Sequence, residues 1–230
     1  NRIAFSPHLK RVPVFGLGCV AGAAGISRAA DYVRAFPEEY ALLVSVELCS
    51  LTIQREDLTA ANLIASGLFG DGAAAVVVAG EGRPGPGPRI VGTRSVFYPN
   101  TEGAMGWRVS EKGFSVVLSS EVPELARSRL RRDVDPFLAA HGLERGDIAV
   151  WIAHPGGPKV IDAVGEALEI APEKLDVARR SLREVGNLSS ASVLLVLEDT
   201  LLNGSPEPGQ YGLLLAMGPG FCSELVLLRF

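Results

Sequence analysis

Cys19 is the residue of this sequence best placed to act as a nucleophile. It stands between Gly16-Leu17-Gly18 and the small residues Val20-Ala21-Gly22-Ala23, which open a predicted helix. A sulfur at that point faces the free N–H groups of the helix start, which favour the reactive thiolate. Small neighbours also leave room for a substrate. A buried structural cysteine is the alternative, and the local pattern leaves both interpretations open.

A histidine and an asparagine could complete such a site. His154 follows a predicted strand and precedes Pro155-Gly156-Gly157, a setting in which an imidazole can reach a cleft. Asn187 lies in Val185-Gly186-Asn187-Leu188-Ser189-Ser190, and its amide could donate a hydrogen bond to a developing oxyanion. The same side chain could instead cap a helix that begins there.

Phe69 and the segment from Met217 to Gly220 have simpler interpretations of their own. Phe69 precedes the expected turn Gly70-Asp71-Gly72, where a phenylalanine usually belongs to the core. Met217-Gly218-Pro219-Gly220 is typical of a tight turn between two strands, although a rigid turn could also form the wall of a cavity.

The composition is that of a packed globular protein. The 230 residues are 47% hydrophobic and 21% charged, with a net charge of −4. This balance argues against a nucleic-acid partner. Three cysteines are too few for a disulfide framework and favour a reducing, cytoplasmic location. No apolar run reaches the length of a membrane span, so no membrane partner is expected.

These residues must be positioned by alternating strands and helices. We predict strands over 10–19, 40–46, 73–79, 89–98, 114–118, 148–153, 211–217 and 223–230. We predict helices over 20–36, 59–68, 121–140, 159–168 and 187–202. The stretch Gly80 to Pro88 is the best candidate boundary between two parts. The alternation predicts an α/β fold whose sheets are covered on both faces.

Five motifs together resemble one family. GLGCVAGA, LFGDGAAAV, AHPGGPKV, VGNLSSASV and AMGPGF occur in the order found in type III polyketide synthases, the chalcone synthase-like family. Their spacing is also similar, with 50 residues from Cys19 to Phe69 and 33 from His154 to Asn187. The resemblance runs from about Lys10 to the end of the chain.

The resemblance implies a thiolase-like layered αβαβα fold. Residues 1–80 would be the remainder of an N-terminal half that carries the nucleophile, 81–88 a linker, and 89–230 the C-terminal half. Family members carry a long stretch before the cysteine that this sequence, which begins at Asn1, lacks. We therefore expect an incomplete N-terminal half, as in a fragment or a cleaved chain.

The resemblance also implies a role for each motif. Cys19 would carry the starter and the growing chain, while His154 and Asn187 would stabilise the thioester enolate formed by decarboxylation. Phe69 would be an aromatic gatekeeper between the coenzyme A tunnel and the reaction cavity. Gly218, Pro219 and Gly220 would scaffold that cavity. No metal is needed, and no familiar metal-ligand spacing is visible.

Other cavity positions differ from those of the plant enzymes. Val116 replaces a second gatekeeper phenylalanine, Trp107 a cavity glycine, and Cys49 a cavity threonine; Thr52 and Ser189 are further expected substrate contacts. The stretch Glu47 to Thr52 is especially similar to that of the bacterial tetrahydroxynaphthalene synthases, which use malonyl-CoA as both starter and extender. Alkylpyrone and alkylresorcinol synthases, which load a long acyl-CoA starter, share much of this pattern.

The expected activity is therefore decarboxylative condensation of malonyl-CoA units followed by cyclisation, giving 1,3,6,8-tetrahydroxynaphthalene. Coenzyme A thioesters are the expected substrates, with no further cofactor, and the family implies a homodimer. Two alternatives remain. One is a ketoacyl-ACP synthase III relative, and the other is an inactive fragment or non-catalytic partner subunit.

Overall fold

The computed structural model describes residues 3–83, 85–111, 113–204 and 206–230. The chain start at residues 1–2 and Pro84 of the expected linker lie outside the described residues. The helices are α1 (Ala21–Ala35), α2 (Ala60–Leu68), α3 (Val122–Ala139), α4 (Pro158–Leu168), α5 (Asp176–Val185) and α6 (Ser190–Asn203), with short 3-10 segments η1 (Gly18–Val20), η2 (Cys49–Thr52), η3 (Arg145–Asp147) and η4 (Pro172–Leu175). The strands are β1 (Tyr40–Leu48), β2 (Asp71–Ala79), β3 (Arg89–Phe97), β4 (Met105–Ser110), β5 (Gly113–Leu118), β6 (Ile148–Ala153), β7 (Tyr211–Gly218) and β8 (Cys222–Arg229).

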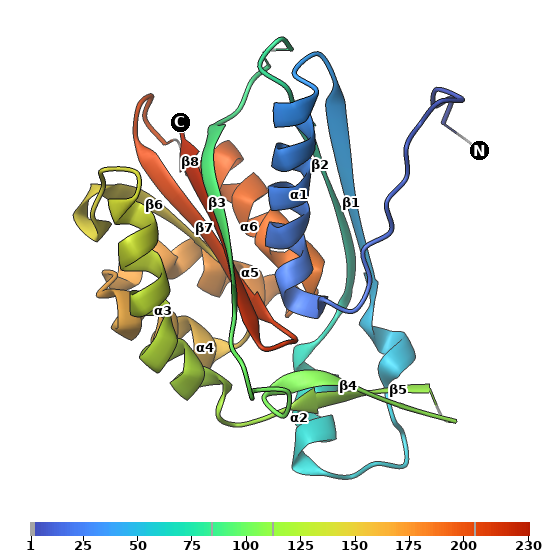
Figure 1. Ribbon diagram of the computed structural model, residues 1–230. Coiled ribbons are helices and arrows are strands. Elements are labelled where there is room, and N and C mark those ends of the chain that lie inside the picture. Colours follow the sequence, from blue (N-terminus) through green and yellow to red (C-terminus); the bar gives the residue numbers. More distant parts are fainter. Residues whose placement is uncertain (1–2, 84, 112, 205) are drawn as a thin grey trace.

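The fold is layered, with α1 and α6 between two sheets (Figure 1). One sheet is the antiparallel pair β1-β2, and the other has the order β3-β8-β7-β6. In the larger sheet, β6 and β7 are parallel and the remaining neighbours antiparallel. Both central helices contact both sheets, while α3 and α4 lie on the opposite face of the larger one. This arrangement fixes the ends of α1 and α6 relative to one another.

The two central helices suit their buried position in different ways. Alanine and glycine dominate α1, which lets its neighbours approach closely. Gly22 is an example, because a Cβ there would lie 2.2 Å from the carbonyl oxygen of Ser190. α6 has buried side chains around most of its circumference, which is typical of a helix enclosed on all sides.

The outer face of β1-β2 is apolar and uncovered among the described residues. Val44 and Val46 of β1 are 59% and 62% exposed, and Val77 of β2 is 64% exposed. The opposite face, which includes Leu43, packs on α1. The prediction that sheets would be covered on both faces is therefore wrong for this sheet. It holds for the larger sheet, whose strands β7 and β8 are almost entirely buried.

Several predicted elements need correction. The expected strand at 10–19 is an exposed segment without regular structure that ends in η1, because no neighbouring strand pairs with it in the described chain. The expected turn at 70–72 is wrong, since Asp71 and Gly72 already pair with β1. The last predicted helix starts at Ser190, not Asn187. Strand β4 and helix α5 were not predicted. The other predicted elements are confirmed, with bounds shifted by a few residues at most, and β6 matches at both ends.

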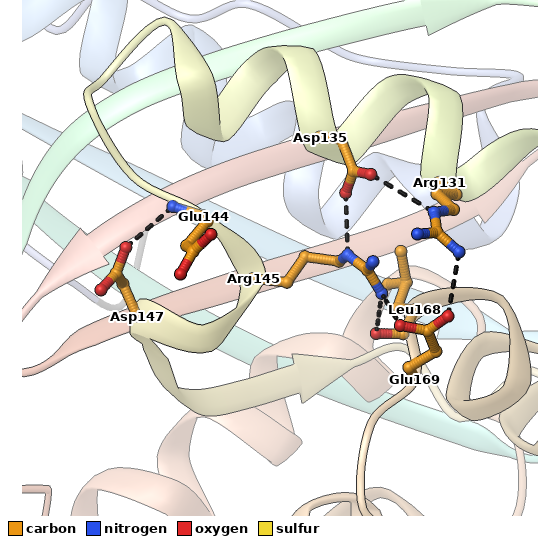
Figure 2. A network of polar contacts seen from close by, with 7 residues as sticks. All are labelled: Arg131, Asp135, Glu144, Arg145, Asp147, Leu168 and Glu169. Carbon is orange, nitrogen blue, oxygen red and sulfur yellow. Dashed lines mark hydrogen bonds and ion pairs between the residues drawn. The ribbon is translucent and has the colours of Figure 1, made fainter.

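An ion-pair network ties α3 to the end of α4 (Figure 2). Arg145 of η3 reaches Asp135 of α3 at 2.9 Å, and it donates a 2.6 Å hydrogen bond to the carbonyl oxygen of Leu168. Arg145 and Arg131 also reach opposite carboxylate oxygens of Glu169, at 3.1 and 2.9 Å. The Arg145 side chain is only 18% exposed, so water screens its contacts poorly.

Replacing Arg145 by alanine should lower the free energy of unfolding by about 2 kcal/mol, because it leaves the last carbonyl of α4 without this donor and the Asp135 carboxylate with only its 3.4 Å contact to Arg131. Replacing Arg131 by alanine is the matched control. Its side chain is 54% exposed, and its loss should cost less than about 1 kcal/mol. Urea titrations of both variants measure the difference, and equal costs would contradict this account of Figure 2.

Candidate active site

Cys19 lies in η1, directly before the first turn of α1. Its side chain is 4% exposed and faces the segment between α5 and α6. The Sγ atom is 3.9 Å from both the amide oxygen and the amide nitrogen of Asn187, a residue 168 positions away in sequence. Two predicted site residues are thus brought together by the contact between α1 and α6.

The Asn187 amide is held in one orientation by the backbone. Its Oδ1 accepts a hydrogen bond from Ser189 N at 2.9 Å, and its Nδ2 donates to the carbonyl oxygen of Gly156 at 3.2 Å. An amide has two N–H donors, so one remains for the sulfur or for a ligand. The alternative interpretation of Asn187 as a helix cap is wrong, because α6 begins three residues later, with Ser189 at its N-cap.

His154 lies at the end of β6, where its backbone N–H extends the ladder to Leu215 of β7. The side chain is 6% exposed, and neither ring nitrogen has a hydrogen-bond partner among the described residues. A Cβ on Gly156 would lie 3.4 Å from the imidazole. The α-carbon of Gly156 therefore lies next to the imidazole of His154, and its carbonyl oxygen accepts the hydrogen bond from the Asn187 amide. Two buried ring nitrogens without partners are the arrangement expected of a group that binds a ligand.

The expectation that Cys19 is held as a thiolate is not met in this structure. Burial raises the pKa of the Cys19 thiol to about 12, while hydrogen bonds from Ser189 and Asn187 act in the opposite direction. The charges of Glu47 and Cys49 raise it further. Burial also lowers the pKa of His154 to about 4. Both groups are therefore neutral near pH 7. For Cys19, the cost of keeping a thiolate away from water is larger than the stabilisation that was expected from the N–H groups at the helix start.

The pKa of His154 has a measurable consequence for stability. An unfolded histidine has a pKa of about 6.5, so between that value and about 4 the unfolded chain binds more protons than the folded one. The free energy of unfolding should therefore fall by up to about 3 kcal/mol as the pH drops through this window. His154→Gln should lack this part of the pH dependence, as urea titrations at several pH values can measure. Parallel stability curves for the two proteins would refute the assignment.

The turn between β7 and β8 packs directly on the nucleophile segment. A Cβ on Gly218 would lie 2.7 Å from Val20 N and 3.0 Å from the carbonyl oxygen of Leu17. A Cβ on Gly18 would lie 3.0 Å from the ring of Pro219. Gly220 lies in the same turn and has a φ of 144°, which favours glycine. The glycines at 218 and 220 therefore allow close packing against η1 as well as a tight turn.

Phe69 is adjacent to the site through its backbone. It forms an isolated parallel bridge with Asn187, in which Asn187 N donates to Leu68 and Gly70 N donates to Asn187. Cys49 and Thr52 lie at the ends of η2, and Thr52 Oγ1 donates to the Cys49 carbonyl oxygen at 2.8 Å.

Trp107 and Val116 are directly opposite one another in the β4-β5 hairpin. The hairpin contacts η2 and α2, and Gln54 donates a 3.0 Å hydrogen bond to the carbonyl oxygen of Phe114. Trp107 packs edge-on against the Phe114 ring, with the ring centroids 6.0 Å apart. These two predicted cavity residues thus share one face of a hairpin next to η2, without a direct contact to Cys19 among the interactions found.

Sequence reasoning missed Glu47, whose carboxylate accepts hydrogen bonds from Ser190 beside the Cys19–Asn187 pair. Its signal was the one acidic residue in a mostly apolar stretch.

The hollow of about 570 Å³ beside the network of Figure 2 contains none of the site residues. Within the described residues, no group of three or more His, Cys, Asp or Glu side chains is placed to hold a metal ion. No helix of the described chain is long and apolar enough to cross a membrane.

Both the sequence and the fold of this chain match those of known proteins. The family model for the C-terminal domain of chalcone and stilbene synthases matches residues 89–230, and the N-terminal domain model matches residues 1–82. A 1,3,6,8-tetrahydroxynaphthalene synthase of Streptomyces peucetius subsp. caesius is 56% identical over all of this chain and 61% of its own length. A 3,5-dihydroxyphenylacetyl-CoA synthase of Amycolatopsis balhimycina is 34% identical over 62% of its length.

The solved structure of 1,3,6,8-tetrahydroxynaphthalene synthase from Streptomyces coelicolor A3(2), described as a bacterial type III polyketide synthase, superposes with a TM-score of 0.94. The match has 38% sequence identity and covers 98% of this chain and 64% of that one. The chain therefore spans about three fifths of the length of the proteins that it matches.

Proposed function

Because this chain belongs to the chalcone and stilbene synthase family, we propose that it carries the catalytic groups of a type III polyketide synthase. The fold is the thiolase-like layered fold of that family. The proposed reaction is repeated decarboxylative condensation of malonyl-CoA on Cys19, followed by cyclisation. One observation carries the proposal: the buried Cys19 thiol lies beside the Asn187 amide, and this amide donates to the carbonyl oxygen of Gly156, two residues after His154, whose ring nitrogens have no partner among the described residues.

Acyl transfer requires the Cys19 thiol to lose its proton. The neutral imidazole of His154 is the base that the site offers, and the proton would move to it as the sulfur attacks the thioester carbonyl of an acyl-CoA. A new S–C bond forms, the bond between the acyl carbon and the coenzyme A sulfur breaks, and the leaving thiolate takes the proton from His154.

Chain extension uses the two remaining groups. Malonyl-CoA loses carbon dioxide, and the negative charge of the resulting enolate collects on its thioester oxygen. The free N–H of Asn187 and an N–H of His154 are the donors that would bind this oxygen. A single donor of this kind contributes about 3–4 kcal/mol to lowering the barrier. The enolate carbon then attacks the acyl group on Cys19, the S–C bond breaks and the Cys19 thiolate leaves, so the chain, longer by two carbons, is carried on coenzyme A. Transfer of this chain back to Cys19 would release coenzyme A and begin the next round.

The residues around this centre would select the product. We assign Phe69 to the entrance, because it is paired with Asn187 in a bridge whose hydrogen bonds are made by its neighbours Leu68 and Gly70. Cys49, Thr52, Trp107 and Val116 would form the cavity wall on the η2 and β4-β5 side, and Ser189, Gly218, Pro219 and Gly220 its other walls. Similarity to named tetrahydroxynaphthalene synthases supports 1,3,6,8-tetrahydroxynaphthalene as the product.

Several properties of the whole protein follow from this assignment as proposals. Its substrates would be malonyl-CoA and, if it loads a different starter, an acyl-CoA, with no additional cofactor. It would act as a homodimer in the cytoplasm. The segment 81–88 would link a part that carries the nucleophile to residues 89–230, which carry His154 and Asn187.

Incubation with radiolabelled malonyl-CoA alone tests the proposal. An aromatic or pyrone product, together with label on the tryptic peptide containing Cys19, is the expected result. A requirement for an acyl carrier protein would instead indicate a ketoacyl-ACP synthase III relative. Label on Cys49 or Cys222 with none on Cys19 would remove the basis of the proposal.

A further inference from the structure

Helix α6 begins without the side-chain cap that helices of its kind usually have. Ser189 occupies the N-cap position, but its side chain accepts no hydrogen bond from the first turn. Its φ is 51°, in the left-handed region that a serine rarely adopts. Ser189 is also the residue whose N–H orients Asn187, and its side chain lowers the pKa of the Cys19 thiol against the larger effect of burial. The start of α6 is therefore a strained turn within the candidate site.

Glu47, in β1, supplies the missing cap from another element. Its Oε1 accepts a hydrogen bond from Ser190 N, the first N–H of α6, at 3.2 Å. The same oxygen accepts from the Ser190 hydroxyl. Ser45, two residues earlier on the same face of β1, lies 2.7 Å from that hydroxyl. Since a hydroxyl has one proton, Ser190 donates to Glu47 and Ser45 must donate to Ser190.

The charge of Glu47 fits this position. A carboxylate at a helix N-terminus is stabilised by the unpaired N–H groups and the helix dipole. Glu47 is 143 residues from Ser190 in sequence, so it joins the β1-β2 sheet to the segment that carries Asn187. Burial is the main cause that raises the pKa of the Cys19 and Cys49 thiols, and the negative charge of Glu47 raises both further.

We propose that Glu47 is a positioning residue of the active site, which caps α6 from β1 and thereby holds the Asn187–Ser189 turn against Cys19. The catalytic consequence of this role rests on the proposed function. The effect of Glu47 on the reactivity of Cys19 can be measured without any turnover. This role explains why Glu47, which takes no part in the proposed condensation chemistry, is partly buried at this position.

Two substitutions separate the charge of Glu47 from its hydrogen bonds. Glu47→Gln keeps an oxygen that can accept from Ser190 but removes the charge. Glu47→Ala removes both. The measurement is the alkylation rate of each cysteine by iodoacetamide at about pH 8, followed by peptide mapping, in the folded protein. Cys222 is the internal reference, because the acidic residue that raises its pKa is Glu224 and not Glu47.

In Glu47→Gln, Cys19 and Cys49 should both react faster, by roughly tenfold for each pH unit by which the thiol pKa falls. Cys222 should react at its original rate. In Glu47→Ala, Cys49 should accelerate as it does in Glu47→Gln, whereas Cys19 should gain less. The reason is that the uncapped turn no longer holds the Ser189 and Asn187 hydrogen bonds to its sulfur.

Equal alkylation rates of Cys19 in the two variants would overturn the positioning role. Equal acceleration of all three cysteines would also overturn it, because it would indicate that the whole fold has become less stable. Product formation gives a second readout. Glu47→Ala should lose at least about tenfold per folded molecule, since the donor amide is misplaced, whereas Glu47→Gln should retain most of the activity. If the protein makes no polyketide at all, the proposed function fails, but the cysteine rates still decide the role of Glu47.

Discussion

Replacing Cys19 by alanine should lower the amount of condensed polyketide by more than about a thousandfold, because it removes the sulfur proposed to carry the acyl chain. The side chain is 4% exposed, so the smaller alanine is expected to leave the fold intact. Malonyl-CoA should still lose carbon dioxide, since that step depends on the donors at His154 and Asn187. Chromatography of labelled products and release of labelled carbon dioxide measure the two steps separately.

Cys222→Ser is the matched control for this experiment. Cys222 Sγ donates a hydrogen bond to the carbonyl oxygen of Pro219 at 3.1 Å, which a serine hydroxyl can replace. This variant should form product at close to the original rate. If Cys19→Ala made polyketide as fast as Cys222→Ser, Cys19 would not be the nucleophile.

Replacing Gly22 by alanine should lower the free energy of unfolding by about 2–3 kcal/mol and reduce product formation with it. The added Cβ would lie 2.2 Å from the carbonyl oxygen of Ser190 and 2.8 Å from Val193 Cγ1. A backbone oxygen cannot rotate away, so α1 and α6 must separate. Such a shift moves Cys19 relative to Asn187, because each lies next to one of the two helices.

Gly67→Ala makes the same chemical change in a different setting. Gly67 lies in α2, is exposed, and has nothing within 4 Å of an added Cβ. Alanine in an open helix is better than glycine by about 0.5–1 kcal/mol, so this variant should be more stable than the original protein. Urea midpoints of the two variants should move in opposite directions, and shifts of the same sign would show that the close approach of α1 and α6 is not limiting.

The elements that the sequence predicted well are those whose pattern is local. β6 is a short apolar run between turn residues, and α2 begins after Thr59, whose hydroxyl oxygen accepts a hydrogen bond from Asn62 N. The elements that were missed depend on context. β4 contains glycine, arginine and serine and is a strand because it pairs with β5. α5 contains three arginines and only two buried residues, so its apolar pattern was too sparse to detect.

The candidate site divides in the same way. Cys19, His154 and Asn187 stood out because each adjoins a glycine-rich or small-residue turn at the end of an element. The charge state of Cys19 could not be inferred, since its burial depends on α6, which lies far along the chain. Glu47 was missed for a similar reason, because its partner Ser190 is 143 residues away. Local pattern identified the reactive groups, whereas their environment is a property of the packed layers.

The uncovered outer face of β1-β2 has a consequence for how this polypeptide behaves in a test tube. Valines exposed side by side attract one another more strongly when ions such as sulfate, which are excluded from protein surfaces, are added. Because hydrophobic attraction weakens on cooling, a chilled, dilute solution of low salt content should keep the chains dispersed. Warm ammonium sulfate should drive them out of solution while the thiol of Cys19 remains enclosed within each molecule.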